Sequence, residues 1–419
     1  TIFDNFFPNI MVIVLKKRGK NSKMKMVISS KNTNKYAKEE RKMIIMDLKI
    51  DNFLAFKNFH MNMSYPKKIV DSYIDHEYLQ ERTNFRYKKV NILMGGNATG
   101  KTSIGKVLMC ICNFIKNKEA NSIVSKVGDT KKEASITVDF IGHSLRMYRL
   151  DIKVKPSDEE GELPKVFVCK RVTDIGEKDR YETCAAKIDR IPLEYNEDYA
   201  EELEKIDPIG WMFTYPLDMG NKAVEFPQDP SFLKVMEYTL KSLDPAIKSV
   251  EKSKEVVNTF IVHMQSGDLL VQDGEVIKKN ILSSGTKAGI DIASLIYSIY
   301  KGECGFYYCD EKFSYIHSEL EKAFLNVMIH GLRNGEQLFF TTHNSDIMDL
   351  PLPKHSYIFL KKDIHNEEEP IKCVYASDYL KRNTDSIRRA IDNDLFATSP
   401  NLEYVYEIAE ISEFSKEEC

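Results

Sequence analysis

The glycine-rich segment at residues 95–102 has the residue types and spacing most specific for chemistry in this sequence. It reads Gly-Gly-Asn-Ala-Thr-Gly-Lys-Thr and fits the pattern G-x-x-x-x-G-K-[ST] between an apolar run and a helix-like run. Backbone N–H groups of such a loop can surround a phosphate at a helix start. Lys101 would reach the β- and γ-phosphates, and the Thr102 hydroxyl would bind Mg²⁺. An ordinary glycine-rich turn is the alternative. The residues predicted to bind nucleotide are Gly95, Gly96, Asn97, Ala98, Thr99, Gly100, Lys101, Thr102 and Ser103.

Two adjacent acids follow another apolar run, at residues 305–309. A buried parallel strand would deliver both carboxylates to the rim of a sheet. There Asp310 would hold Mg²⁺ through its water shell, and Glu311 would polarise the water that attacks the γ-phosphate. Acids at a strand end also occur as solvated caps. When this pair is considered by itself, that alternative stays open.

A histidine ends a third apolar run, Leu338-Phe-Phe-Thr-Thr-His343. Its imidazole could hydrogen-bond a γ-phosphate, although a lone histidine after a strand is usually structural. His343 lies 32 residues after Glu311, with helix-like spacing over residues 318–332 between them. This spacing predicts a strand-helix-strand unit.

A second candidate anion site precedes an amphipathic helix at residues 283–286. Small hydroxyl residues and a glycine at a helix start can bind an anion, although an ordinary helix cap is an equal alternative. One triphosphate does not need two such sites in one chain, so this loop would close on the nucleotide of another copy. Its residues are Ser283, Ser284, Gly285 and Thr286.

Several further elements must position these residues. Periodicity predicts helices over 103–115 and 231–243. Partial alternation over 44–53 is typical of an edge strand, and a second strand follows at 56–63 to begin a sheet. Further strand signals lie at 134–140, 145–154, 166–172, 256–264 and 269–277. We divide the chain into a basic extension (1–42), a first part with the phosphate loop (43–173), an inserted acidic lobe (174–245) and a second part with the remaining motifs (246–419).

Composition indicates a globular chain of 419 residues with 42% hydrophobic residues, enough for one large or two ordinary domains. No apolar stretch approaches the roughly eighteen residues that cross a bilayer, so neither a membrane span nor a secretory signal is expected. The eight cysteines include no C-x-x-C pair, which favours reduced thiols in a cytoplasmic protein and no zinc site.

Charge is uneven along the chain, although its net value is only -3. Residues 16–42 carry eleven Lys or Arg and two Glu. This basic tail could bind nucleic acid or anionic lipid. It lacks periodicity and precedes Met43 and Met46, so we expect residues 1–42 to be disordered or to precede the natural start.

The order of these motifs resembles the ABC-type ATPases, specifically their SMC/RecF-like branch. Asn97, the opening Leu48–Phe53 and Thr342-His343-Asn344 favour that branch over transporter subunits. The sequence is most similar to ATP-binding proteins related to the OLD family, many of them from bacterial anti-phage operons, through residues 310–320 and 393–400. The resemblance covers roughly residues 43–405.

The resemblance implies an α/β phosphate-loop ATPase with a mixed sheet core, an antiparallel N-terminal β subdomain and an inserted, mainly helical lobe. It implies an ATP–Mg²⁺ site in which Thr102 and Asp310 serve the metal, Glu311 is the catalytic base and His343 is the γ-phosphate switch. Ser284 and Gly285 would act across a homodimer or higher oligomer. Two departures stand out: Ser284 replaces the first of two glycines, and no glutamine loop can be placed, since Gln228 and Gln265 are poor candidates.

These expectations favour a cytoplasmic, Mg²⁺-dependent ATPase that dimerises on ATP and regulates a separate effector, a nuclease or toxin, in anti-phage defence. The alternatives are a RecF/SMC-like DNA-maintenance ATPase that binds nucleic acid, and a nucleotide-locked scaffold or sensor with slow hydrolysis. A transporter subunit is disfavoured. A nuclease within this chain is also disfavoured, because Asp392 and Asp394 follow a helix-like run rather than a strand.

Overall fold

The computed structural model describes residues 42–69, 72–157, 163–215, 227, 229–256, 258–272, 275–276, 284–382, 385–396 and 405–408. They belong to one compact unit that spans residues 40–419. The predicted basic extension therefore lies outside the described residues, apart from residue 42. Among the described helices, none is both long and apolar enough to cross a membrane.

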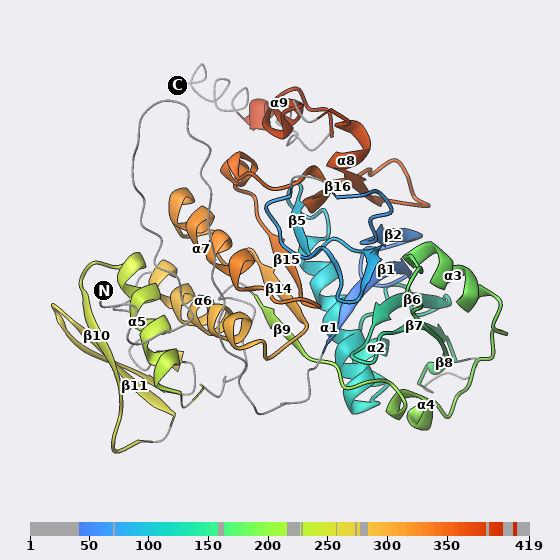
Figure 1. Cartoon of the computed structure of the whole chain (residues 1–419), viewed down its shortest axis with the longest axis horizontal. Helices are drawn as coiled ribbons and strands as arrows, with labels where there is room; N and C mark the ends of the chain where they lie inside the picture. The colour runs from blue at the N-terminus through green and yellow to red at the C-terminus, as the bar shows by residue number, and fades with distance from the viewer. Residues whose placement is uncertain are drawn as a thin grey trace, which may run out of the picture. The chain divides into compact units, whose positions relative to one another are not determined.

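A six-stranded sheet forms the centre of the fold, in the order β17-β16-β5-β15-β14-β9 (Figure 1). The five strands from β9 to β16 are all parallel, and β17 is antiparallel to β16. Strands β5, β14 and β15 are buried along their whole length, as expected for parallel strands covered on both faces. The strands are β5 (Val90–Met94), β9 (Trp211–Thr214), β14 (Phe306–Asp310), β15 (Gln337–Thr341), β16 (Tyr357–Lys362) and β17 (Ile371–Tyr375).

Helices cover both faces of this sheet. Helix α1 (Lys101–Asn117) packs on one face with Tyr308, whereas α6 (Ser284–Lys301) and α7 (Ser318–Gly331) pack on the other with Tyr307. This division follows from the alternation of side chains along β14. The predicted helix at 103–115 is confirmed. So is the strand-helix-strand unit, because α7 connects the parallel strands β14 and β15.

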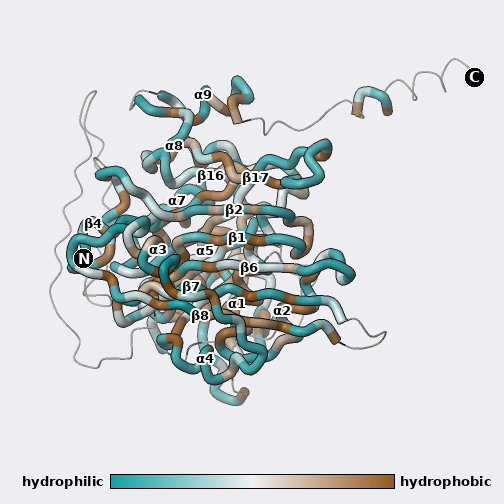
Figure 2. Tube along the Cα trace, turned by 90° about the vertical axis from the view of Figure 1, so that its right-hand side faces the viewer, coloured by the Kyte–Doolittle hydropathy of each residue, from teal (hydrophilic) through white to brown (hydrophobic). Residues whose placement is uncertain are grey.

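A five-stranded antiparallel sheet packs against the far side of α1, in the order β2-β1-β6-β7-β8 (Figure 2). The pairing of β1 with β2 confirms that the two predicted strands begin a sheet. The prediction of an edge strand is wrong for β1, because β2 and β6 pair with its two sides. The strands are β1 (Ile44–Asp51), β2 (Phe59–Asn62), β6 (Ala134–Ile141), β7 (Arg146–Lys155) and β8 (Lys165–Asp174).

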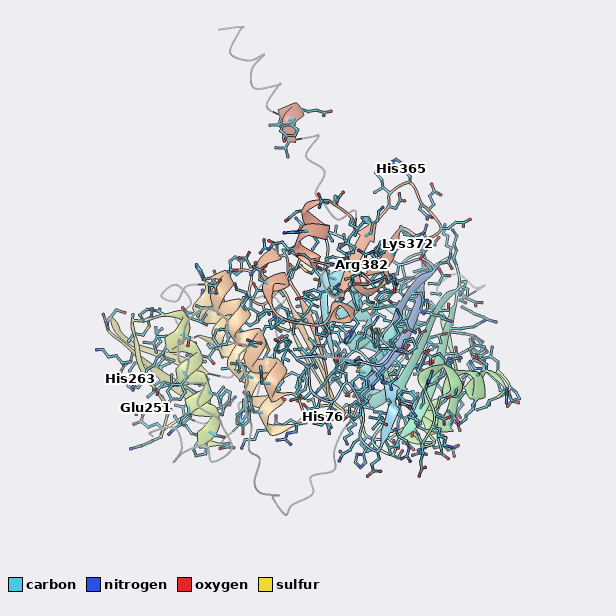
Figure 3. The ribbon with its side chains drawn as sticks, turned by 45° about the horizontal axis from the view of Figure 1, so that its top comes forward. His76, Glu251, His263, His365, Lys372 and Arg382 are labelled. Atoms are coloured by element: carbon cyan, nitrogen blue, oxygen red, sulfur yellow. The ribbon has the colours of Figure 1, made fainter. Side chains whose placement is uncertain are left out.

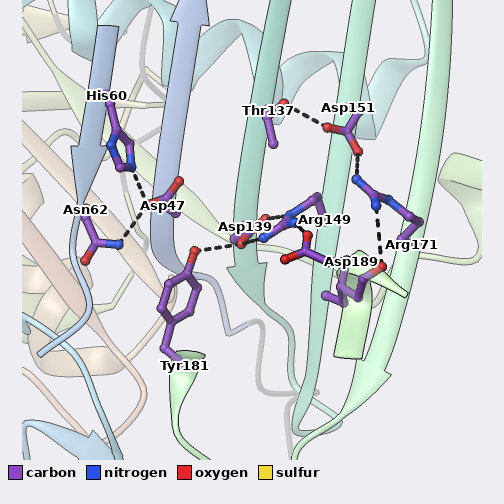
Figure 4. Close-up of polar contacts among 11 residues, drawn as sticks. Asp47, His60, Asn62, Thr137, Asp139, Arg149, Asp151, Arg171, Tyr181 and Asp189 are labelled. Carbon is purple, nitrogen blue, oxygen red and sulfur yellow. Dashed lines mark hydrogen bonds and ion pairs between the residues drawn. The ribbon is translucent and has the colours of Figure 1, made fainter. Parts of the chain in front are cut away.

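A buried polar network fastens α3 (Tyr181–Asp189) to the outer face of this sheet (Figure 4). The Tyr181 hydroxyl donates to Asp139 at 2.8 Å, and two guanidinium nitrogens of Arg149 donate to the same carboxylate at 2.6 Å each. Burial raises the pKa of Asp139, while the hydrogen bonds from Arg149 oppose that rise. The network satisfies a carboxylate that would otherwise be costly to bury.

A third, antiparallel sheet, β10-β11-β12-β13, packs on α5 (Pro230–Leu243) and on one side of α6. Asp229 caps α5 by accepting from the Ser231 N–H at 2.8 Å, and Pro230 occupies the first helical position. Helix α6 thus belongs to two cores, that of the central sheet and that of this smaller unit. The strands are β10 (Ile247–Lys252), β11 (Thr259–Met264), β12 (Gly267–Gln272) and β13 (Glu275–Val276).

The segment 174–245 differs from the predicted inserted lobe. Its helix α3 packs on the antiparallel sheet, its strand β9 belongs to the central sheet, and its helix α5 packs on α6. The reason is long-range pairing: β9 is parallel to β14, which lies far downstream in the chain. The remaining short elements are α2 (Asn121–Val124), β3 (Tyr78–Leu79), β4 (Arg82–Arg86), α4 (Ala200–Glu204), η2 (Ser345–Asp349), η3 (Lys354–Ser356), α8 (Ala376–Tyr379) and α9 (Ile387–Asp392).

Candidate functional site

The carboxyl ends of three adjacent parallel strands bring the predicted site residues together. Strand β5 leads into the loop at 95–100, its neighbour β15 leads into His343, and β14 ends at Asp310. Parallel strands present their carboxyl ends at one edge, where α/β folds build their sites. The structure therefore joins motifs that lie more than two hundred residues apart.

The loop at 95–100 has the backbone of a phosphate cradle. Gly95 and Gly100 have φ angles of 151° and 100°, and Ala98 has a φ of 58°, so three positions are left-handed. A Cβ atom on Gly95 would lie 2.5 Å from the Leu360 carbonyl oxygen, so no side chain fits there. The loop ends at the start of α1, where the unpaired N–H groups and the helix dipole favour an anion.

Lys101 folds back over this loop. Its Nζ donates to the carbonyl oxygens of Gly95 at 3.0 Å and Gly96 at 3.1 Å, and it lies 3.4 Å from Glu311 Oε1. Burial lowers the pKa of Lys101, and the charge of Glu311 opposes that change. The ammonium therefore lies between the loop and Glu311, where a terminal phosphate would need a positive charge.

Asp310 is fully buried and accepts hydrogen bonds from two threonines. The Thr102 hydroxyl donates at 2.6 Å and the Thr341 hydroxyl at 2.7 Å. Burial raises the pKa of Asp310, and these hydrogen bonds oppose the rise. A carboxylate beside a hydroxyl is a set of hard oxygen ligands that fits Mg²⁺ bound to a substrate phosphate. The two residues predicted to serve the metal are therefore adjacent.

Glu311 has a left-handed backbone, with a φ of 42°, which is strained for a residue that is not glycine. Its N–H donates to the Thr341 hydroxyl at 2.9 Å. Its Oε1 lies 2.8 Å from His343 Nε2, and this hydrogen bond is the main cause that lowers the pKa of Glu311, against the effect of burial. The carboxylate is therefore held in its basic form.

The loop that carries His343 is tied to α7 by a second buried acid. Glu321 accepts from the Thr342 hydroxyl and from the Asn344 amide, each at 2.7 Å. Burial raises the pKa of Glu321. A cavity of about 320 Å³ opens beside this loop, lined by Glu311, Phe313, Ser314, Ile316, Ser318, Glu321, Thr342, His343 and Asn344.

Sequence reasoning missed three residues that organise the site: Thr341, Glu321 and Tyr308. Tyr308 donates its hydroxyl to the Lys101 carbonyl oxygen at 2.6 Å and so ties β14 to the first turn of α1. Glu321 did carry a signal, because it lies on the apolar stripe of α7 with Phe324, Leu325 and Met328. Thr341 carried none, since a threonine in a strand is unremarkable.

The second anion motif begins α6. Ser284 is its first residue and is exposed, Gly285 is half-buried, and Thr286 is buried. Ser283 lies outside the described residues. Closure of this helix start on the nucleotide of a second copy stays a prediction, because it concerns a contact between two chains.

Of the two glutamines named as poor candidates for a glutamine loop, Gln265 lies among the described residues, away from this edge. Gln265 lies between β11 and β12 and donates its N–H to Ala246, whereas Gln228 lies outside the described residues. On the side of β14 opposite β15, the neighbouring strand is β9, where Thr214 pairs with Cys309.

Among the charged residues labelled in Figure 3, His263 on β11 lies 3.2 Å from Glu251 on β10, in the third sheet. His365 follows the carboxyl end of β16, the parallel neighbour of β5. Asp392 is the last residue of the helix α9, as its helix-like sequence indicates. Asp310 and Glu311 contact Thr102 and Lys101 at the phosphate loop, and His343 contacts Glu311.

No protein-family profile matches this sequence, and no curated protein sequence matches it. Solved structures with a similar chain path include an Smc head bound to the C-winged helix domain of ScpA (13% identity, TM-score 0.45, covering 83% of this chain and 99% of that one). An Smc head with an extended coiled coil from Pyrococcus furiosus has 11% identity and a TM-score of 0.48, covering 81% and 98%. The recombination mediator RecF with ATPrS has 10% identity and a TM-score of 0.40, covering 80% and 99%. The residues of the site, rather than these similarities, carry the functional assignment.

Proposed function

We propose that this chain binds ATP with Mg²⁺ and hydrolyses it to ADP and phosphate. The observation that carries this assignment is the convergence of Lys101, Glu311 and Asp310 at one sheet edge. Lys101 Nζ lies 3.4 Å from Glu311 Oε1, and the Thr102 hydroxyl lies 2.6 Å from Asp310 Oδ2. A phosphate-binding loop, a metal-binding pair and a base thus lie within reach of one terminal phosphate.

Each residue has a distinct part in the reaction. Lys101 leaves the carbonyl oxygens of Gly95 and Gly96 and neutralises the β- and γ-phosphates. Glu311, kept ionised by His343, accepts the proton of the attacking water. Thr102 and Asp310 would hold Mg²⁺, which supplies positive charge to the phosphates when bound. His343, with its side chain 40% exposed, is placed to donate to the γ-phosphate and so to respond to its presence.

Two copies of the chain would enclose the nucleotide. Support comes from Ser284, Gly285 and Thr286 at the start of α6, with Ser283 before them in the sequence, a second candidate anion-binding element that one triphosphate within one chain does not require. We propose a homodimer or higher oligomer in which Ser284 and Gly285 contact the nucleotide of the partner copy.

Three variants test this assignment. Lys101→Ala should abolish Mg²⁺–ATP binding, whereas Lys106→Ala, on the same helix, should leave binding unchanged. Glu311→Gln should bind ATP, lose about 100-fold or more of the hydrolysis rate, and accumulate as a dimer in light scattering. Normal turnover by Glu311→Gln would exclude Glu311 as the base.

The wider role is proposed from the resemblance to OLD-related proteins: ATP-driven opening and closing of the dimer would regulate a separate nuclease or toxin in anti-phage defence. Loss of protection by Lys101→Ala in infected cells, together with an effector protein that co-purifies from them, would support it.

Salt-sensitive, ATP-dependent binding of duplex DNA by residues 43–419 would instead favour DNA maintenance. Assembly that persists after ATP is removed would count against a scaffold held together by nucleotide.

A further inference from the structure

Lys312, the residue after the proposed base, is buried in an unusual set of contacts. Only 2% of its surface is exposed. Its Nζ forms an ion pair with Asp291 of α6 and donates to the Tyr215 carbonyl oxygen at 2.5 Å. One ammonium therefore joins the turn after β14, the helix α6 and the residue that follows β9.

A buried ammonium needs such partners, because an unpaired charge in the protein interior is strongly unfavourable. An aliphatic side chain would fill the same space without that requirement. The side chain of Lys312 is therefore better explained by the connection that it makes than by packing.

The connection lies next to a strained backbone position, that of Glu311. Glu311 has its φ of 42° between two anchors: the Thr341 hydroxyl holds its own N–H, and Asp291 and Tyr215 hold the side chain of the next residue. Strained positions persist only where surrounding contacts fix them. Without the second anchor, the turn would relax and the carboxylate would move away from the phosphate loop.

We propose that Lys312 is a positioning residue that holds Glu311 in its working geometry and ties that geometry to α6. The inference rests on the proposed ATPase function. Asp291 lies seven residues after Ser284, about two helical turns from the start of α6. A partner nucleotide that engages Ser284 thus acts on the same rigid helix that anchors the base of this chain.

The test compares Lys312→Met, the double variant Lys312→Met/Asp291→Leu and wild type, with Lys205→Met as control. Lys205 pairs with Glu202 at 2.6 Å in an exposed position after α4. The double variant removes both charges and leaves neither unpaired in the interior, so we expect it to fold even if the single variant does not. Circular dichroism and thermal melting establish folding before activity is compared.

We expect the double variant to bind ATP with wild-type affinity but to lose about 10- to 100-fold in kcat, the effect of a misplaced reacting group. A loss of affinity with unchanged kcat, or wild-type hydrolysis, would overturn the inference. The control should match wild type in both quantities.

A second measurement does not depend on hydrolysis. Hydrogen exchange of residues 307–316 in the nucleotide-free protein should be faster in the double variant than in the control, with α7 unchanged. Unchanged exchange in 307–316 would overturn the inference. If wild type does not hydrolyse ATP but this exchange difference is found, the ATPase assignment fails and the anchoring role of Lys312 stands.

Discussion

His343 Nε2 lies 2.8 Å from Glu311 Oε1, so the residue predicted to sense the γ-phosphate contacts the residue predicted to activate water. This hydrogen bond is the largest cause that lowers the pKa of Glu311. The predicted switch and the predicted base therefore form one hydrogen-bonded unit. ATP would compete for the imidazole.

Replacement of His343 by Ala should raise the pKa of Glu311, because its main stabilising partner is lost. We expect ATP hydrolysis to fall by about 100-fold. The acidic limb of the pH–rate profile should also move to higher pH, since the base is needed ionised. His343→Gln, which keeps an N–H donor, should show a smaller shift. An acidic limb that stays in place in His343→Ala would show that Glu311 does not set it.

Thr341 holds both acids, because its hydroxyl donates to Asp310 and accepts from the Glu311 N–H. Thr341→Val leaves a buried carboxylate oxygen and a backbone N–H without this partner, at a cost of about 1–3 kcal/mol in the free energy of unfolding. The loss of a hydrogen bond that lowers the pKa of Asp310 should also raise the Mg²⁺ concentration for half-maximal activity. Thr341→Ser keeps the hydroxyl and should behave like wild type. An unchanged Mg²⁺ requirement in the valine variant would contradict this role.

The site was predictable from the sequence where chemistry depends on local spacing. The loop at 95–102, the acids at the end of β14 and His343 after β15 each follow an apolar run, and parallel pairing brings such ends together. The strand β9 was not predictable, because its four residues are defined by pairing with β14 rather than by a pattern of their own. The role of Lys312 was hidden for the same reason, since its partners belong to α6 and to the residue after β9.

Gly105 offers a test of the packing between α1 and the central sheet. An alanine inside a helix is ordinarily more stable than glycine, by about 0.5–1 kcal/mol. Here a Cβ atom would lie 2.6 Å from Tyr308 Cε1, and Tyr308 is fixed by burial and by its hydrogen bond to Lys101. Gly105→Ala should therefore destabilise the protein by about 1–3 kcal/mol in urea unfolding, whereas Lys106→Ala should have little effect. A more stable Gly105→Ala would show that this contact can relax.

The burial of Glu336, which is not part of the candidate functional site, predicts that the free energy of unfolding depends on pH. Burial raises its pKa from 4.5 to about 7, while its Oε2 accepts from the Arg333 N–H at 2.7 Å. Because the folded state binds the proton more tightly than the unfolded state, this group favours folding below pH 4.5, and its contribution is lost as the pH rises to about 7.

Glu336→Gln keeps an oxygen acceptor and removes the titration. Relative to wild type, the variant should therefore gain stability as the pH increases, by up to about 3 kcal/mol above pH 7. Urea unfolding of both proteins at pH 5 and pH 8 measures this difference. A stability difference that is equal at the two pH values would mean that Glu336 titrates alike in the folded and unfolded chains, and its burial would then have no effect on its proton affinity.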